Sequence, residues 1–140
     1  KILTALAKVN LAKQTKANFW SLTCDTQALA NIRLMGECVD ETMQRFAIIT
    51  SLIQRLGPIG KADLEEKVVA IAKRLSVLNN IEAPEFIDKK AQAILINAMK
   101  ELQYLGTNEQ GLLIENSTLA HLKAIVIKLV DIEVLQSIAR

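Results

Sequence analysis

Few side chains in this sequence could support catalysis, and their spacing fits none of the common arrangements. The one histidine is His121, and the two cysteines are Cys24 and Cys38. A single histidine cannot build a His-based metal cluster, and the cysteine spacing does not match a zinc or thioredoxin-type motif. No acid follows His121 before Asp131, so we interpret it as a histidine on the surface of a helix or at the boundary of the core. We interpret the cysteines as reduced thiols, one or both of them packed against the core.

Paired acids and glycine motifs add no further candidate. Asp40-Glu41 and Glu65-Glu66 are adjacent in sequence, and neighbouring positions on a helix point about 100° apart, so they do not flank one substrate bond. The sequence contains no GxGxxG or GxxxxGK[ST] loop for phosphate and no GxSxG nucleophile turn. We therefore predict no catalytic residue, no metal ligand and no cofactor in this chain.

Composition predicts a helical domain. The chain has 140 residues, of which 51% are hydrophobic, 4% aromatic, 5 glycine and 2 proline, which is typical of a helical core of Leu, Ile, Val and Ala. Because the chain begins at Lys1, we expect it to be part of a longer one. The longest uncharged apolar run, between Arg45 and Arg55, is too short to cross a bilayer.

Charge is distributed unevenly along the chain. The net charge is +2, but residues 1–24 contain four lysines and no acid, so this segment carries +4 and the remainder carries −2. Two interpretations stay open: a solvated end, or a contact with anionic lipid or an acidic neighbouring domain.

The periodicity of apolar residues predicts a long central helix. We expect a helix over 1–15 and a short strand over 18–23, with Thr23 or Asp25 capping the central helix. Over 26–56, apolar residues recur at steps of three and four, and further apolar residues lie off that stripe, so this helix should be buried on more than one face. Gly57-Pro58 should end it. The stripe consists of Leu29, Ile32, Gly36, Val39, Met43, Phe46, Thr50 and Ile53, and the residues off it are Leu34, Met35, Ile48, Ile49 and Leu52.

Three further helical regions and a hairpin should come after it. A helix over 61–78 ends at Asn79-Asn80, Pro84 opens a turn, and Asp88 caps a helix reaching to about 103. A hairpin around TNEQ and a last helical region, capped by Asn116 or Ser117 and interrupted at Asp131, complete the chain. The inward positions are predicted as Leu64, Val68, Ile71, Leu75, Leu78, Ala91, Ile94, Leu95, Ala98 and Leu102.

The predicted fold is mainly α, a helical bundle around a long central helix with a small, winged-helix-like β-hairpin. We divide it into 1–24, the tail of a preceding subdomain, and 25–140, a helical C-terminal domain. In a winged helix the segment after Asp88 would enter the DNA major groove. That segment offers polar side chains such as Gln92 but also carries Glu101, and the TNEQ turn has no basic residue to reach phosphates. We predict no nucleic-acid partner.

Two segments resemble a known family. Glu41–Ile48 reads ETMQRFAI, and Ala72–Lys89 reads AKRLSVLNNIEAPEFIDK. With this spacing they are similar to the C-terminal region of the bacterial membrane-associated glycerol-3-phosphate acyltransferases. Two positions depart from the expected pattern: Asn80 replaces a glycine, which a left-handed helix cap tolerates, and Ile87 replaces an aromatic residue. The motif residues to which we assign structural or interface roles are Glu41, Gln44, Arg45, Arg74, Ser76, Pro84, Glu85, Phe86 and Asp88.

The resemblance implies a longer enzyme whose catalytic site lies elsewhere. The family's HxxxxD motif is not in this sequence, because Val126 stands where His121 would need an aspartate. The implied enzyme transfers a fatty acyl group from acyl carrier protein or coenzyme A to the sn-1 hydroxyl of glycerol 3-phosphate, at the cytoplasmic face of the bacterial inner membrane. Its implied partners here are its own N-terminal catalytic domain and an anionic membrane surface. The alternative is a stand-alone helical or winged-helix-like interaction module.

Motif residues also have structural interpretations. We expect Arg45 and Arg74 on helix faces, paired with Glu41 or Glu66 at helical distance. Phe86 should anchor the turn that Pro84 opens.

Overall fold

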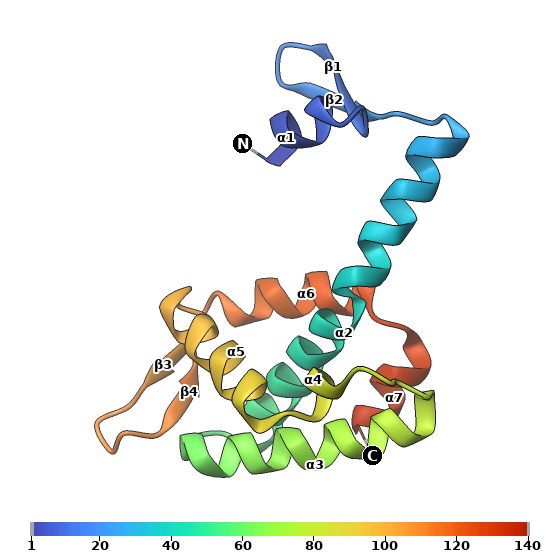
Figure 1. The fold of residues 1–140 in the computed structure, drawn as a ribbon. Helices are drawn as coiled ribbons and strands as arrows, with labels where there is room; N and C mark the ends of the chain where they lie inside the picture. Colours follow the sequence, from blue (N-terminus) through green and yellow to red (C-terminus); the bar gives the residue numbers. More distant parts are fainter. Residues whose placement is uncertain (1, 140) are drawn as a thin grey trace. The chain divides into compact units, whose positions relative to one another are not determined.

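A computed structural model describes residues 2–139, apart from the Cys38 side chain. The chain forms two compact units, Lys1–Val39 and Asp40–Arg140, and helix α2 (Thr26–Leu56) contributes residues to both. The structure is mainly helical with two small antiparallel strand pairs (Figure 1), which confirms the predicted fold class. The assignment of 1–24 to a preceding subdomain stays a prediction.

The first unit begins with a short helix and a hairpin. Helix α1 (Ile2–Lys8) is followed by strands β1 (Ala12–Lys16) and β2 (Phe19–Leu22), which pair antiparallel. The predicted strand over 18–23 is confirmed, but the predicted helix over 1–15 is wrong beyond Lys8. Asn10, at φ 56°, takes a left-handed conformation that ends the helix, and the following residues gain a pairing partner in β2.

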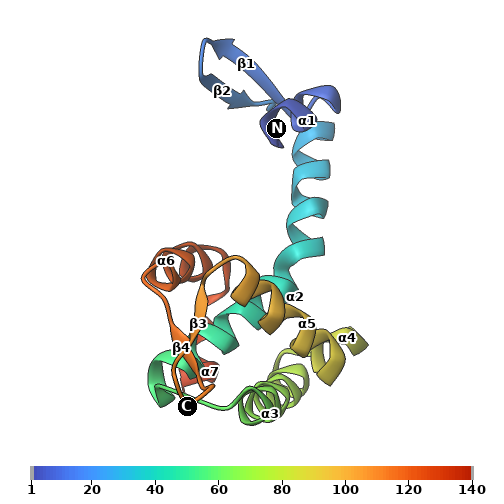
Figure 2. The ribbon, with the colours of Figure 1, turned by 90° about the vertical axis from the view of Figure 1, so that its left-hand side faces the viewer.

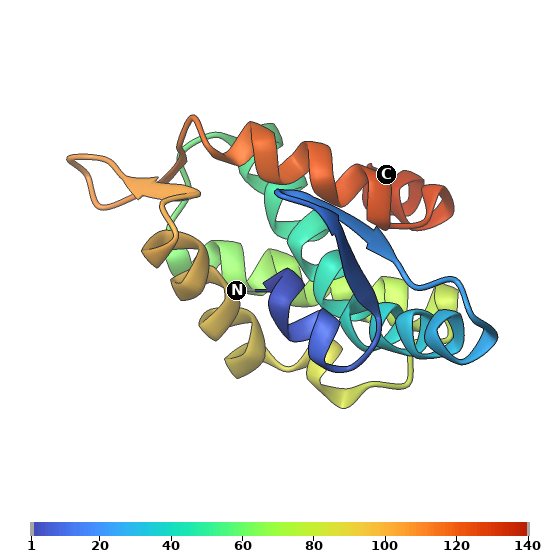
Figure 3. The same cartoon turned by 90° about the horizontal axis from the view of Figure 1, so that it is seen from above.

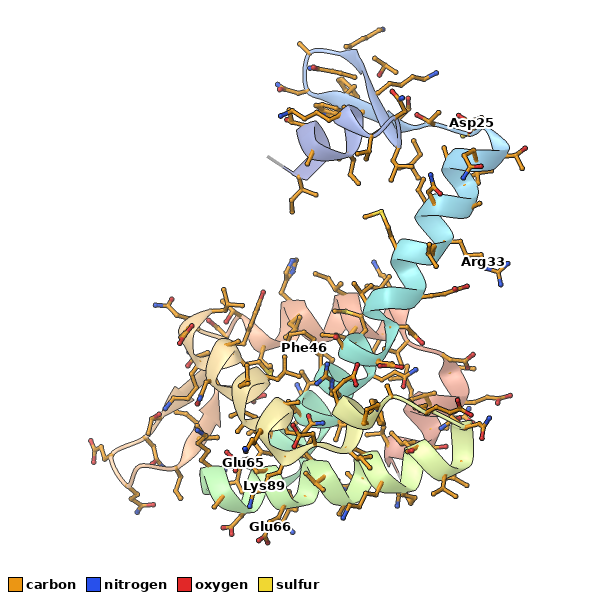
Figure 4. All side chains as sticks on the ribbon, in the orientation of Figure 1. Asp25, Arg33, Phe46, Glu65, Glu66 and Lys89 are labelled. Carbon is orange, nitrogen blue, oxygen red and sulfur yellow. The ribbon has the colours of Figure 1, made fainter. Side chains whose placement is uncertain are left out.

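Helix α2 begins at its predicted cap. The Asp25 Oδ1 atom accepts a hydrogen bond of 2.8 Å from the Ala28 amide, and Figure 4 shows Asp25 at the start of the helix. In the first unit this helix leaves four large apolar side chains exposed and Ile32 half-buried, so the predicted burial on more than one face is wrong for this half. The exposed side chains are Leu29, Leu34, Met35 and Val39.

In the second unit, the rest of α2 forms the centre of the core. Ala47, Ile48, Ile49, Leu52 and Ile53 are each at most 2% exposed and share one cluster with residues of all the other helices of this unit. Figures 1 and 2 show those helices placed around α2. They are α3 (Lys61–Asn79), α4 (Pro84–Ile87), α5 (Lys89–Glu101), α6 (Leu119–Leu129) and α7 (Ile132–Ala139).

The second strand pair lies between α5 and α6. Strands β3 (Leu105–Thr107) and β4 (Leu113–Glu115) form the predicted hairpin. Its turn extends beyond the helices of this unit (Figure 3). Backbone bonds of 3.1 and 2.8 Å join Ile59 and Leu113 in both directions, so the loop after α2 fixes the base of the hairpin.

Most predicted helix ends are confirmed. Gly57, at φ 70°, follows the last residue of α2, and Asn80, at φ 53°, is the left-handed cap of α3. The Asp131 Oδ1 atom accepts a bond from the Glu133 amide at the start of α7. The predicted cap of α6 is wrong, because Thr118 occupies that position. The Asn116 side chain does not cap the helix, because its Nδ2 donates to the Gln103 carbonyl at 3.0 Å.

The predicted inward faces of two helices are partly wrong. Leu78, Ile94 and Leu102 are more than 60% exposed. Helix α5 instead buries Gln92, Ile96 and Met99. On this buried face, a hydrogen bond from Gln92 attaches the start of α5 to α4.

Candidate functional site

The residues of the second motif segment form the corner that joins α3, α4 and α5. Ser76 stabilises the turn that follows α3. Its carbonyl accepts hydrogen bonds from the Asn80 and Ile81 backbone amides, and its Oγ donates to the Ile81 carbonyl at 2.8 Å. The chain therefore turns within one left-handed residue, with the polar groups of the turn paired. Ser76 thus determines the direction in which the chain leaves α3.

Phe86 anchors this corner in the core. Pro84 occupies the first turn of α4, where its missing amide hydrogen costs nothing. Phe86 is 0% exposed, and its carbonyl accepts a bond of 2.7 Å from Nε2 of Gln92. Gln92 is itself 0% exposed, and its Oε1 has no partner among the described residues.

Gln92 is the residue of this corner that sequence reasoning missed. The sequence indicated it only as a polar side chain for DNA contact, and the predicted inward face of its helix lies elsewhere. The available signal was the spacing of Gln92, Ile96 and Met99, which is i, i+4, i+7, combined with an amide four residues after a helix cap.

Asp88 caps α5 as predicted. Its Oδ1 and Oδ2 accept from the Lys90 and Ala91 amides, each at 3.2 Å. Two otherwise unpaired amides at the helix start are therefore satisfied. Glu85, in the first turn of α4, is exposed.

Arg74 connects the motif to the last helix. Its Nη2 donates a bond of 2.6 Å to the Ser137 carbonyl of α7, and Arg55 of α2 donates to the Ala139 carbonyl at 3.3 Å. Both guanidinium groups meet the carbonyl end of α7, where a positive charge is favourable.

The first motif segment lies on α2. Gln44 is 6% exposed and its Nε2 donates to Asp40 at 2.9 Å, while Arg45 donates from Nη2 to the Thr42 hydroxyl at 3.2 Å. Two buried atoms here, Gln44 Oε1 and Arg45 Nε, have no partner among the described residues. Glu41 is half-buried.

The predicted pairing of Arg45 and Arg74 with acids on their own helices is wrong. Within residues 2–139, ion pairs join Arg33 to Glu37 at 3.1 Å and Lys61 to Glu65 at 3.8 Å. Arg45 instead donates from Nη2 to the Thr42 hydroxyl, and Arg74 donates from Nη2 to the Ser137 carbonyl.

The side chains most capable of chemistry do not form a recognisable site among the described residues. His121 and Cys24 are both exposed, so the predicted surface position of His121 is confirmed and Cys24 is not packed in the core. The Cys38 side chain lies outside the described residues. Figure 4 shows Glu66 pointing away from the helices, whereas its neighbour Glu65 is half-buried and pairs with Lys61. No three His, Cys, Asp or Glu residues gather closely enough to hold a metal in the part of the chain that the structure describes.

An open hollow lies in each unit. The first measures about 510 Å³ and is lined by Ile2, Leu3, Thr4 and Trp20. The second measures about 300 Å³ and lies where α2, α6 and α7 meet, lined by Ser51, Gln54, Arg55, Lys123, Ile138 and Ala139. Neither contains an acid and a nucleophile together.

Comparison with known proteins identifies the family. The family model described as the glycerol-3-phosphate acyltransferase C-terminal region matches residues 1–108. The chain belongs to this family. The resemblance predicted from the two motif segments is confirmed, and the matched region contains all nine motif residues.

Relatives with the same printed name support this assignment. The chain is 61% identical over its whole length to "Glycerol-3-phosphate acyltransferase" of Colwellia psychrerythraea. It is 32% identical over 129 residues, 90% of the chain, to the protein of that name from Pseudoalteromonas translucida. The chain spans only 17% and 16% of the lengths of these relatives. No solved structure matches the chain.

The helices of the described part give one further result. None of them, over residues 2–139, combines the length and the apolar character that a bilayer span requires.

Proposed function

We propose that this chain is the non-catalytic C-terminal region of a longer glycerol-3-phosphate acyltransferase. The longer enzyme transfers a fatty acyl group from acyl carrier protein or coenzyme A to the sn-1 hydroxyl of glycerol 3-phosphate, in phospholipid synthesis. The match of residues 1–108 to the family model carries this proposal. It is supported by relatives that share the name and are about six times as long as the chain.

The role proposed for this region is to support the enzyme's own N-terminal catalytic domain. In the corner, Ser76, Phe86 and Asp88 are hydrogen-bonded within the chain, and one buried atom, Oε1 of Gln92, has no partner among the described residues. Around Gln44 and Arg45, two buried polar atoms on neighbouring residues lack partners among the described residues. A buried polar group without a partner costs about 1–3 kcal/mol, so groups of another domain that paired with these two atoms would stabilise the protein. The proposed contact with the catalytic domain includes Glu41, Gln44 and Arg45.

The enzyme is proposed to work at the cytoplasmic face of the bacterial inner membrane as a peripheral protein. The chemistry of the product supports work at a membrane, because a lysophosphatidic acid carries a long acyl chain that partitions into a bilayer. The four lysines of residues 1–24, which no acid accompanies, support attachment through a surface of the protein.

An activity assay tests the location of the active site. The longer enzyme and the purified 140-residue chain are each supplied with glycerol 3-phosphate and acyl-coenzyme A or acyl carrier protein, and lysophosphatidic acid is measured. We expect turnover by the longer enzyme alone. Turnover by the isolated chain would contradict the proposal, and so would an upstream reading frame with no HxxxxD motif.

Arg45→Ala tests the proposed contact, with Arg33→Ala on the same helix as its matched control. The Arg33 side chain is 84% exposed and pairs only with Glu37 among the described residues. We expect Arg45→Ala to lower the melting temperature of the longer enzyme more than that of the isolated chain. Arg33→Ala should leave both nearly unchanged. Equal effects of Arg45→Ala in the two proteins would show that Arg45 serves the fold of this region only.

A further inference from the structure

The hollow of the second unit gathers positive side chains from two separate helices. It measures about 300 Å³, and α2, α6 and α7 all contribute to its lining. Ser51, Gln54 and Arg55 lie at i, i+3 and i+4, so they share one face of α2, and the half-buried Lys123 reaches the hollow from α6. The end of α7 supplies the rest of the lining. A guanidinium, an ammonium, a hydroxyl and an amide are therefore brought to one small space.

Both cations of this hollow bond to neutral groups. The Lys123 Nζ atom donates to Oε1 of Gln54, and the Arg55 Nη1 atom donates to the Ala139 carbonyl at 3.3 Å. The two ion pairs within residues 2–139 involve other side chains. An arginine has five N–H donors, and the bond to Ala139 uses one of them. Because hydrogen bonds between ionised groups are stronger than those to a neutral oxygen, each cation would gain from an oxyanion in the hollow.

The helices around this hollow carry almost no negative charge. Residues 42–62 and 116–130 contain no Asp or Glu, and they include the second half of α2 and the whole of α6. Helix α7 has one acid, Glu133, which is exposed in its first turn, at the other end of the helix from the hollow. The last carbonyls of α7 are partly negative, and Arg55 already bonds to one of them. The lining thus contains two positive side chains and no negative one.

We propose that this hollow, the basic hollow, binds a phosphate monoester. The basic hollow is defined by Ser51, Gln54, Arg55 and Lys123. Arg55 offers a fork of donors and Lys123 a compact charge, while the Ser51 hydroxyl and the Gln54 amide donate to the remaining oxygens. A phosphate monoester has three acceptor oxygens and a charge of about −1.5 to −2 at pH 7. The proposal goes beyond the proposed function, because it adds a ligand site outside the catalytic domain.

A phosphate monoester suits the basic hollow better than a carboxylate does. A carboxylate is planar, and one guanidinium can pair with both of its oxygens. It would then leave Lys123, on a different helix from Arg55, without a charged partner. A tetrahedral phosphate can accept from both helices at once. A volume of about 300 Å³ lies at the small end of ligand pockets, which favours a phosphate with a short organic group.

Titration of the isotope-labelled 140-residue chain, followed by NMR, tests the proposal. Methyl phosphate replaces sodium chloride at constant ionic strength, so that general screening of charge stays fixed. We expect saturable shifts of the backbone amides of residues 51–56, 123 and 138–139, with a dissociation constant on the order of 1 mM. Shifts that do not saturate, or that are as large at lysines elsewhere in the chain, would contradict the proposal.

Substitutions in the basic hollow should weaken binding. Arg55→Gln and Lys123→Gln should each raise the dissociation constant about tenfold, because each removes one charge-assisted hydrogen bond. Arg55→Lys keeps the charge and loses the fork of donors, so it should weaken binding less than Arg55→Gln does. The spectrum of each variant without ligand verifies that its fold is unchanged.

Matched controls remove the same charges outside the hollow. Lys128→Gln lies on the exposed part of α6, and Arg33→Gln removes a guanidinium of α2 that is 84% exposed. Each should change the dissociation constant by less than about twofold, since the charge removed is screened by salt. Equal affinities for the hollow variants and these controls would overturn the proposal, because net charge alone would then explain the binding.

Two further ligands distinguish the source of the phosphate group. Glycerol 3-phosphate carries it on a water-soluble group, and dihexanoyl phosphatidic acid, kept below its micelle concentration, carries it on a lipid. We expect at least one of them to shift the same amides and to bind at least as tightly as methyl phosphate. If inorganic phosphate binds but none of the three monoesters does, the hollow takes an adventitious ion only and the proposal is wrong.

Failure of this proposal is distinguishable from failure of the proposed function. A longer enzyme that makes lysophosphatidic acid, combined with a basic hollow that ignores phosphate monoesters, would remove this inference only. Binding that Arg55→Gln and Lys123→Gln weaken would stand even if the longer enzyme had a different activity.

Discussion

Gln92 offers the sharpest test of how the corner between α4 and α5 is held. Its side chain is 0% exposed, its Nε2 donates to the Phe86 carbonyl at 2.7 Å, and its Oε1 has no partner within the described residues. The carbonyl belongs to a four-residue helix, whose carbonyls have no partners within the helix. The amide thus contributes one strong bond and one unpaired oxygen.

Three substitutions separate these contributions. Gln92→Met keeps the length of the side chain. It leaves the Phe86 carbonyl unpaired, which destabilises the fold, and it removes the unpaired oxygen, which stabilises the fold. Because each effect is about 1–3 kcal/mol and they have opposite signs, the free energy of unfolding should change by less than about 1.5 kcal/mol. Gln92→Ala loses the bond and leaves a cavity, which should cost about 2–5 kcal/mol. Gln92→Glu replaces the donor with an oxygen facing a carbonyl oxygen in a buried site and should cost more than about 3 kcal/mol.

Urea unfolding followed by circular dichroism measures these free energies, with the slope m compared between variants to confirm that the transition is unchanged. Gln136→Glu, on the exposed face of α7, is the matched control and should change the free energy by less than about 0.5 kcal/mol. A Gln92→Glu variant as stable as Gln92→Met at high pH, where the carboxyl is ionised and cannot donate to the Phe86 carbonyl, would refute the account.

Three other sites make independent predictions. Asp88→Ala removes the acceptor for two amides at the start of α5 and should lower the free energy of unfolding by about 1 kcal/mol, measured in the same urea experiment, whereas Asp88→Asn should stay within a few tenths. Asn80→Gly should be neutral or slightly stabilising because residue 80 has φ 53°, and Asn80→Val should cost more than about 1 kcal/mol; thermal unfolding distinguishes them. Arg74→Ala should speed hydrogen exchange in the last turn of α7 and leave α5 unchanged, since Arg74 donates to the Ser137 carbonyl.

Helix ends could be predicted from the sequence because their causes are local. Asp25 and Asp88 lie within three residues of the amides that they cap, and Asn80 and Gly57 take left-handed conformations that most residues avoid. The wrong cap of α6 shows where this reasoning stops. Asn116 bonds to Gln103, which is 13 residues away in sequence, and no local pattern indicates that contact.

Helix faces were harder to predict, for a tertiary reason. Ile94 and Leu102 are apolar and at helical spacing, yet both are exposed, while the polar Gln92 is fully buried. Gln92 bonds to the Phe86 carbonyl and lies on the same buried face of α5 as Ile96 and Met99. The sequence did not predict strand β1 for a similar reason. Its residues, AKQTK, include no run of β-branched or aromatic side chains, and they form a strand by pairing with β2.

The motif divides into residues that the fold explains and residues that it does not. Ser76, Phe86 and Asp88 form hydrogen bonds within this chain, so they stabilise the fold of this region whether or not another domain binds it. Arg45 and Gln44 are different: each holds a buried polar atom that nothing in the described part of the chain satisfies. A substitution at the corner can therefore lower activity of a longer enzyme merely by unfolding this region. Only substitutions in the Gln44–Arg45 pair, measured in the isolated chain and in the longer enzyme together, can separate stability of the region from contact with another domain.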